Sequence, residues 1–325
     1  MILEHEGTHT NGDSLTHEQK TGSYRKNATQ SSSNQEKKSD AQCLVIHAEC
    51  TEWLRRPGQD SKPIDLTFLD PPFNQGKAYT SHNDDMCEED YWLWMKEICQ
   101  LTRQKSSDGA GIYFMQREKN CEQVLRVLRE SGWTYQNLII WKKKTSAVPS
   151  SFRLGKSHQI IVFATNGRKP RVFNKLRIDP PLPAGYKPRE NGMLLTDVWD
   201  DIREMTSGYF AGDEALRNPN GSRAHNQQSP IALLLRIILC SSSPGDLVFD
   251  PFAGTATTGV VSSQLGRNSI CLEKDAQNFG VMTHRVSFPR ASDSVNRFLK
   301  DYTHTDSLVQ ITGLHEGQKN RINGT

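Results

Sequence analysis

Four consecutive residues, Asp70-Pro71-Pro72-Phe73, could perform chemistry on a planar ring. They follow the apolar run 64–69, which predicts a strand, and the prolines must end it because neither can donate a ladder hydrogen bond. The stiff turn offers a carboxylate and backbone carbonyls as acceptors beside an aromatic side chain. These acceptors suit the two protons of an exocyclic amino group, with Phe73 stacked on the ring that carries it.

A second motif, Phe-Asp-Pro-Phe-Ala-Gly-Thr-Ala-Thr-Thr-Gly at residues 249–259, lies between a predicted strand and a predicted helix. Gly254 permits a tight turn close to a ligand, and the helix that follows offers free N–H groups. Glu273 comes nineteen residues after Gly254 and ends the next strand, as does the acid that binds ribose hydroxyls in dinucleotide folds. No G-x-G-x-x-G accompanies these residues, so a dinucleotide is not the expected ligand.

Strands alternate with helices along most of the chain. This order predicts an α/β fold with a doubly wound, mostly parallel, Rossmann-like sheet, in which ligands bind at the carboxyl ends of strands. Both motifs follow predicted strands. The predicted strands are 44–46, 64–69, 111–115, 138–141, 160–163, 247–249 and 269–272, and the predicted helices are 50–56, 89–101, 117–130, 230–240 and 255–265.

Composition divides the 325 residues into five segments. The polar residues 1–41 predict a disordered tail, and residues 169–224, rich in proline, glycine and arginine, an irregular insert. The insert separates halves at 42–168 and 225–290, and 291–325 is a C-terminal extension. We expect no membrane partner and a cytoplasmic location, because no apolar run is long enough to span a bilayer and the N-terminus lacks signal-peptide features. Seven scattered cysteines without C-x-x-C spacing predict reduced thiols and no metal site.

Positive charge is concentrated in one stretch. The net charge is only +3, yet residues 141–190 hold twelve Lys and Arg against two acidic residues. This bias is consistent with an ordinary solvated face, but it also favours a polyanionic partner that meets one face.

The two motifs in this order, with a basic insert between them, resemble the DNA amino-methyltransferases that use S-adenosylmethionine, in the circularly permuted β-class arrangement. There a D/N-P-P-Y/F/W motif precedes a D-P-F-x-G motif. The resemblance extends over about residues 43–290, most of the insert excepted, and includes Trp141-Lys142-Lys143, Thr196-Asp197-Val198-Trp199 and residues 225–230. The chain departs from the family at Ala256, where a second glycine is usual and alanine would narrow the loop, and at Ser229, where a lysine is usual.

The resemblance implies a site-specific DNA methyltransferase that moves the methyl group directly to N6 of a flipped adenine, without a metal. Residues 42–168 would be its catalytic half, 169–224 its target-recognition insert and 225–290 its cofactor-binding half. Asp70 and the Pro71 carbonyl would accept the amino protons, Pro72 would hold the turn, and Phe73 would stack on the base. Glu273 would bind the ribose of the cofactor, and His225, Gln228 and Ser229 would lie near its methionine part. The motif loop at the cofactor would consist of Asp250, Phe252, Ala253, Gly254 and Thr255, and DNA would contact Lys142, Lys143, Lys144, Lys169, Arg171, Lys175 and Arg177.

Several alternatives remain open at this stage. Aspartate at position 70 favours adenine over the Ser-Pro-Pro pattern common in cytosine-N4 enzymes, but the two amino groups are chemically alike. Ala256 and Ser229 also allow a catalytically inactive DNA-binding module, and a similar Pro-Pro site would serve RNA or a protein glutamine. Expected partners are double-stranded DNA and a cognate restriction endonuclease, with the chain as a monomer or a homodimer.

Overall fold

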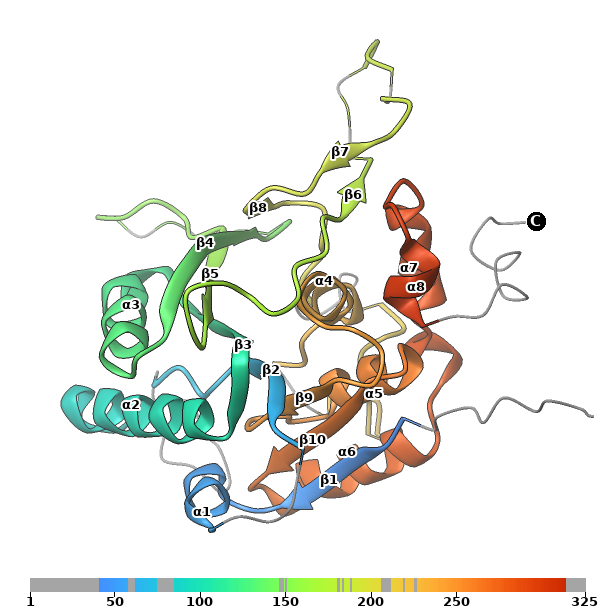
Figure 1. Ribbon diagram of the computed structural model, residues 1–325. Helices are drawn as coiled ribbons and strands as arrows, with labels where there is room; N and C mark the ends of the chain where they lie inside the picture. The colour runs from blue at the N-terminus through green and yellow to red at the C-terminus, as the bar shows by residue number, and fades with distance from the viewer. Residues whose placement is uncertain are drawn as a thin grey trace, which may run out of the picture. The chain divides into compact units, whose positions relative to one another are not determined.

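A computed structural model describes residues 41–57, 62–74, 85–145, 149, 151–179, 182, 184–187, 189–205, 212–218, 220–224 and 227–313. Residues 1–40 of the predicted tail and 314–325 of the predicted extension lie outside the described residues. Within residues 39–325, which form one compact unit, the strands of the central sheet have the order β1-β10-β9-β2-β3-β5-β4-β8 (Figure 1). The strands are β1 (Cys43–His47), β2 (Ile64–Leu69), β3 (Ser106–Arg117), β4 (Thr134–Lys142), β5 (His158–Thr165), β8 (Val198–Trp199), β9 (Leu247–Asp250) and β10 (Asn268–Glu273).

The sheet is mostly parallel, as the sequence predicts. Strands β1, β10, β9, β2 and β3 all run in one direction, whereas β5 pairs antiparallel with both β3 and β4. All six residues of β2 are buried, as is typical of a parallel strand covered on both faces. The carboxyl ends of β1, β10, β9 and β2 therefore meet at one edge of the sheet, side by side.

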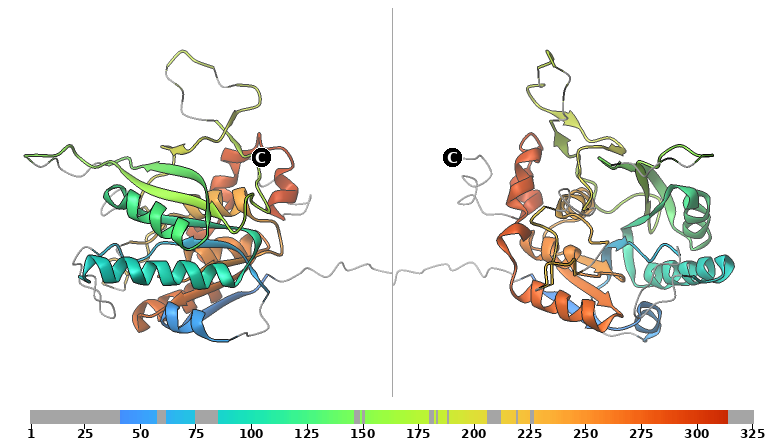
Figure 2. Two further views of the ribbon diagram at one scale, coloured as in Figure 1. Left: turned by 60° about the vertical axis from the view of Figure 1, so that its left-hand side comes forward. Right: turned by 180° about the vertical axis from the view of Figure 1, so that it is seen from behind.

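Helices cover both faces of the sheet (Figures 1 and 2). One apolar core lies under α1 (Cys50–Arg55), α2 (Glu88–Gln104) and α3 (Cys121–Glu130). A second lies under α4 (Ile231–Ser241) and α5 (Thr257–Gln264), and it also buries side chains from the C-terminal α7 (Asn296–Leu299) and α8 (Leu308–Thr312). Next to α5, α6 (Ala276–Ser287) packs on β1 and β10. None of the helices in the described ranges is both long and apolar enough to cross a membrane.

The insert contributes to the main sheet as well as to a separate hairpin. Strands β6 (Arg177–Ile178) and β7 (Met193–Leu194) pair with each other, while β8 pairs in parallel with β4. The buried Arg236 on α4 fixes this segment, because its Nη1 donates to Asp201 Oδ1 at 2.8 Å and its guanidinium lies 5.2 Å from the ring centroid of Trp199. Part of the predicted insert is thus built into the sheet, and its boundaries as a domain stay a prediction.

Candidate active site

A cavity of about 620 Å³ lies at the shared edge where β1, β10, β9 and β2 end. Asp70 follows β2, Asp250 ends β9, and Glu273 ends β10. Sequence reasoning predicted these three acids from separate motifs, and the sheet brings them together. Of the remaining predicted residues, Pro72, Phe252, Ala253, Gly254, Thr255, Gln228 and Ser229 also line the cavity, whereas His225 lies outside the described residues.

The turn after β2 is fixed by hydrogen bonds from neighbouring elements. The hydroxyl of Tyr91 on α2 donates to the Pro72 carbonyl at 2.8 Å, and Gln116 Nε2 at the end of β3 donates to that hydroxyl at 3.0 Å. On the other side, Ser229 Oγ donates to Asp70 Oδ2 at 3.1 Å. Ser229 therefore positions the carboxylate that the sequence identifies as the acceptor.

Two residues of the same turn lie away from the cavity lining. Pro71 is buried, and the Phe73 ring is buried in the apolar core under α4, where it does not line the cavity. Stacking of Phe73 on a base stays a prediction. It requires the base to pass beyond the residues that line the cavity and to contact the apolar core that contains Phe73.

The loop after β9 is shaped by the carboxylate of Asp250. Its Oδ1 accepts from the Phe252 N–H at 3.0 Å, and its Oδ2 accepts from the Thr258 hydroxyl on α5. Gly254 has φ +53°, the left-handed conformation that glycine adopts without steric cost. The loop therefore folds around the Asp250 carboxylate, and residues 253–255 line the cavity.

Burial raises the pKa of Asp250 to about 7, partly opposed by the hydrogen bond from Thr258. An unfolded aspartate titrates near pH 3.9, so between about pH 4 and 7 the folded chain holds a proton that the unfolded chain has lost. This group therefore lowers the free energy of unfolding as pH rises through that window. Asp250→Asn is expected to remove the effect and to raise the free energy of unfolding at pH 8 by roughly 2–4 kcal/mol. Urea denaturation of the two proteins from pH 5 to 8 checks this, and parallel profiles would contradict it.

Ala256 sits where the family has its second glycine, and it adopts φ +56°, which costs an alanine roughly 1–2 kcal/mol. Its methyl group is buried with Ala253, Cys271 and Met282 and is not part of the cavity lining. Ala256→Gly relieves the backbone cost but loses about 0.8 kcal/mol of methyl burial, so stability should change by less than about 1 kcal/mol. Cofactor affinity, measured by calorimetry, should change less than about threefold, because the methyl points away from the cavity. A tenfold tightening would show that the alanine obstructs the loop.

Several residues that line the cavity were not predicted from the sequence, among them Glu49 and Trp94. Glu49 follows β1 and caps α1, since its Oε2 accepts from the Glu52 N–H at 2.8 Å. Trp94 is half-buried and meets the Phe252 ring edge-to-face, with the ring centroids 5.6 Å apart. Its indole donates to Thr51 Oγ1 at 2.8 Å. The acid at the end of a strand was the available signal for Glu49, whereas helical periodicity gave none for Trp94.

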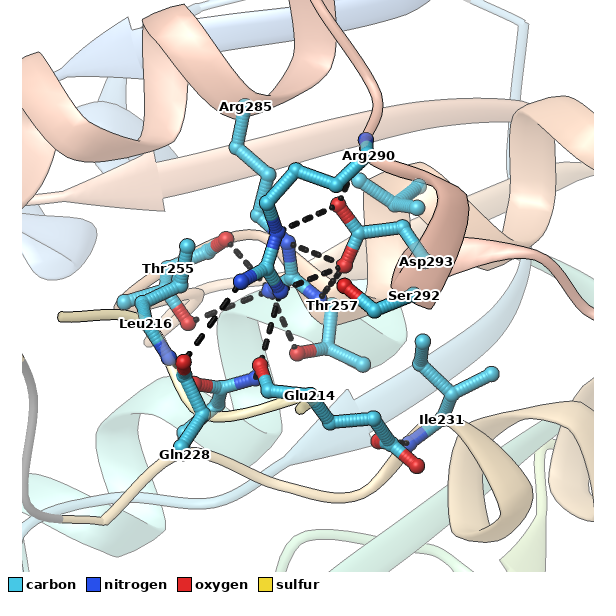
Figure 3. A network of polar contacts seen from close by, with 12 residues as sticks. Glu214, Leu216, Gln228, Ile231, Thr255, Thr257, Arg285, Arg290, Ser292 and Asp293 are labelled. Carbon is cyan, nitrogen blue, oxygen red and sulfur yellow. Dashed lines mark hydrogen bonds and ion pairs between the residues drawn. The ribbon is translucent and has the colours of Figure 1, made fainter. Parts of the chain in front are cut away.

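A buried ionic network holds the loop between β9 and α5 in place (Figure 3). Asp293 Oδ1 accepts from Arg285 and from Arg290, each at 2.8 Å, and Asp293 is fully buried. Arg285 Nη1 in turn donates to the Thr255 carbonyl and to Thr257 Oγ1, both at 3.0 Å. The C-terminal segment thereby fixes the loop that begins α5.

The same network reaches the part of the cavity wall that contains Gln228. Arg290 Nη2 donates to the Glu214 carbonyl at 2.7 Å, and Gln228 Nε2 donates to that carbonyl at 3.1 Å (Figure 3). Gln228 Oε1 accepts from the Leu216 N–H at 3.1 Å. Both ends of the Gln228 amide are therefore engaged within the fold, and the residue lines the cavity mainly as part of its wall.

The predicted DNA-contacting residues do not share one face. Lys142, Lys143 and Lys144 lie where β4 ends, at the same edge as Asp70. Lys169 and Arg171 follow β5, which runs antiparallel, so they lie at the opposite edge. Arg171 forms ion pairs there with Asp65 and Asp246 at the amino ends of β2 and β9. Lys175 and Arg177 lie at the start of the hairpin, where the Arg177 N–H donates to Thr305 Oγ1.

The cavity lining is rich in acids, with Glu49, Asp70, Asp250, Glu273 and Asp275 against Lys274. Such a lining favours a cationic ligand. In the described ranges, no group of three or more His, Cys, Asp or Glu side chains is placed to hold a metal ion.

A Rossmann-like sheet with an acidic cavity at its carboxyl edge, next to an Asp-Pro-Pro turn, defines a methyltransferase fold. Residues 64–282 match the family described as DNA methylase (N6/N4 methyltransferases), and the chain belongs to that family. Members of this family use S-adenosylmethionine as methyl donor.

Two relatives support this assignment by sequence. The type II methyltransferase M.HinfI of Haemophilus influenzae is 27% identical over 262 residues, which are 74% of this chain and 67% of the relative. The DNA adenine methyltransferase YhdJ of Escherichia coli K12 is 28% identical over 250 residues, which are 72% of this chain and 79% of the relative.

Solved structures show the fold. The M1.HpyAVI–SAM complex has a TM-score of 0.53 and 21% identity, and the match covers 75% of this chain and 98% of that one. The cytosine-N4-specific PvuII DNA methyltransferase has a TM-score of 0.55 and 17% identity, and the match covers 88% of this chain and 94% of that one.

Proposed function

We propose that this DNA methyltransferase modifies N6 of adenine at a specific sequence in double-stranded DNA. The observation that carries the proposal is the Asp70 carboxylate, held by Ser229 in the same cavity as Asp250 and Glu273. An acceptor for amino protons and a cationic-ligand site thus share one wall. The name of the Escherichia coli relative, an adenine methyltransferase, supports adenine as the base.

The acidic cavity fits S-adenosylmethionine, a sulfonium that supplies an electrophilic methyl group when bound. Glu273 would accept hydrogen bonds from its ribose hydroxyls, and the backbone of residues 253–255 would contact its chain. The ring pair of Trp94 and Phe252 offers an aromatic wall for its base. Ser229 would lie toward its methionine part, next to Asp70.

On the substrate side, Asp70 and the Pro71 carbonyl would accept hydrogen bonds from the two N–H groups of the target amino group. One of these protons would leave through the Asp70 carboxylate as the nitrogen takes the methyl group and the bond from sulfur to methyl breaks. An exocyclic amino nitrogen is a poor nucleophile because its lone pair is delocalised into the ring, and these acceptors favour a more tetrahedral nitrogen. Tyr91 holds the adjacent Pro72 carbonyl, which fixes the orientation of the turn. Rigid placement of this kind is a large source of rate in transfer reactions. The target base must leave the stack to reach the turn.

The proposed partners follow from this reaction. Lys142, Lys143 and Lys144 would contact phosphates of duplex DNA next to the cavity, and the chain would act in the cytoplasm as a monomer or homodimer. The name of the Haemophilus relative, a type II methyltransferase, supports a cognate restriction endonuclease in the same system. Sedimentation tests the oligomeric state, and co-expression tests the restriction endonuclease as a partner.

The test of the reaction is direct. Purified protein is incubated with mixed-sequence duplex DNA and S-adenosylmethionine, with Asp70→Ala in parallel, and the nucleosides are analysed by mass spectrometry. N6-methyladenine that disappears in the variant is the expected result. N4-methylcytosine would overturn the choice of base alone. Cofactor binding without any methylated base would turn the search to RNA or protein substrates, and loss of both would leave an inactive DNA-binding module.

A further inference from the structure

Glu214, from the predicted insert, provides a carboxylate to the start of α4. Its Oε2 accepts from the N–H of Ile231, the first residue of the helix, at 3.1 Å (Figure 3). The N-cap of this helix is Pro230, which makes no side-chain capping hydrogen bond, and the N–H groups of a first helical turn have no partner within the helix. The helix dipole also favours a negative group at this end. A residue seventeen positions earlier in the chain therefore caps α4.

The main chain at Glu214 also holds the residues just before the helix. The Glu214 carbonyl accepts from Gln228 Nε2 at 3.1 Å, and the Leu216 N–H donates to Gln228 Oε1 at 3.1 Å. The same short segment thus holds the chain at two points, Gln228 and Ile231. Ser229 lies between these two points, so its backbone is fixed from both sides.

Ser229 needs a fixed backbone because its side chain is short. Its Oγ donates to Asp70 Oδ2 at 3.1 Å and is only one bond away from the Cβ atom. A long, flexible side chain could follow a shift of the main chain, but a serine cannot. The orientation of the Asp70 carboxylate therefore depends on where the main chain places Ser229, and a reacting group must be placed to within about 0.5 Å.

Glu214 itself is not among the residues that line the cavity. Burial raises the pKa of the Glu214 carboxyl, and the hydrogen bond from the Ile231 N–H opposes this rise. The contact with the helix therefore favours the charged form, which is the better acceptor. Any effect of this carboxylate on the reaction must be carried by the residues that it holds.

We propose that Glu214 is a positioning residue for methyl transfer, which acts through the start of α4 and through Ser229 on the Asp70 carboxylate. This inference rests on the proposed function. Removal of the Glu214 carboxylate frees the Ile231 N–H and the backbone next to Ser229, so the serine no longer holds Asp70 in one orientation. The chemical step then slows. The Glu214 carbonyl still holds Gln228, so the cavity that would bind the cofactor keeps its wall.

The experiment is a double-mutant cycle on the rate of methyl transfer in a single turnover. Protein loaded with labelled S-adenosylmethionine is mixed with saturating mixed-sequence duplex DNA, for the wild type, E214A, S229A and E214A/S229A. If Glu214 acts through Ser229, E214A slows transfer by roughly 3- to 10-fold and no more than S229A does. The double variant should then be as slow as S229A alone, within about twofold. E214Q keeps an acceptor oxygen for the Ile231 N–H and should stay within about twofold of the wild type.

Cofactor affinity separates a positioning role from a merely structural one. Calorimetry should give E214A an affinity for S-adenosylmethionine within about threefold of the wild type, because the cavity lining is unchanged. D213A is the matched control for E214A. Asp213 is the neighbouring acid, and its ion pair with Arg297 is exposed, so this variant should transfer the methyl group at the wild-type rate.

Four results would each overturn the proposal: losses that multiply in the double variant, an E214Q as slow as E214A, an E214A as fast as the wild type, or a cofactor affinity that falls together with the rate. If E214A does not fold, E214D takes its place in the cycle with the same outcomes, because its shorter side chain withdraws the carboxylate from Ile231. A wild type that transfers no methyl group to duplex DNA would instead refute the proposed function, so the two failures are distinguishable.

Discussion

Replacing Asp70 with alanine is expected to slow methyl transfer by roughly 10²- to 10⁴-fold, the range for loss of a positioned proton acceptor. Cofactor affinity should stay within a few-fold, because Asp250, Glu273 and the loop they hold are untouched. The physical reason is the loss of the Asp70 carboxylate as an acceptor in the turn after β2, which Ser229 orients through a 3.1 Å hydrogen bond. Transfer of a labelled methyl group under single-turnover conditions measures the chemical step.

Two variants separate the roles of charge and position in this prediction. Asp70→Asn keeps one acceptor oxygen and should lose less activity than the alanine variant. Ser229→Ala keeps the carboxylate but frees its orientation, so a loss of about 10-fold or less is expected. An alanine variant at position 70 that keeps a tenth of the wild-type rate would contradict the assignment of Asp70 as the main acceptor.

Three acids of the site, Asp70, Asp250 and Glu273, could be predicted because each ends or directly follows a strand that the sequence marks clearly. Asp70 and Asp250 follow short apolar runs and precede prolines, and Glu273 closes the next run. In a parallel sheet, strand ends share an edge, so these local patterns are enough to bring distant residues together. The prediction that these acids lie at one edge of the sheet did not require the order of the strands.

The basic residues could not be assigned in the same way. Charge along the sequence places Lys144 and Arg171 in one positive band, but β5 runs antiparallel between them and carries Arg171 to the far edge. There Asp65 and Asp246 neutralise it. A single reversal of strand direction, which no local pattern indicates, decides which cations lie at the edge of the sheet that carries the cavity.

The contribution of the C-terminal segment was equally hidden. Arg285, Arg290 and Asp293 are ordinary surface residue types, and their partners Thr255 and Glu214 lie about 30 to 75 positions earlier in the chain. Arg285 and Asp293 are buried, and burial of these two charges becomes acceptable only when they are paired, which is a property of the folded arrangement. The sequence alone therefore gave no role to Asp293, the member of this network that lies in the predicted extension 291–325.

Asp293→Ala is expected to lower the free energy of unfolding by roughly 3–5 kcal/mol, the usual cost of breaking a buried ion pair from one side. The variant would leave Arg285, which is 1% exposed, without its carboxylate, and it would loosen the loop at Thr255 and Thr257. Weaker cofactor binding should accompany the loss of stability. Guanidinium denaturation and calorimetry measure the two effects.

Acid provides an independent check of the same carboxylate. Burial acts to raise the pKa of Asp293, but hydrogen bonds from Arg290 and Arg285 lower this pKa to about 2. The stabilisation is therefore fully present above the unfolded value near 3.9 and is lost as pH falls toward 2, by about 2 kcal/mol. The alanine variant should lack this contribution to the dependence of the free energy of unfolding on pH between pH 4 and 2.

Asp213→Ala is the matched control for Asp293→Ala. The ion pair of Asp213 with Arg297 is exposed, so its loss should cost less than about 1 kcal/mol. Equal costs for the two variants would show that the buried network does not support the fold in the way its geometry indicates.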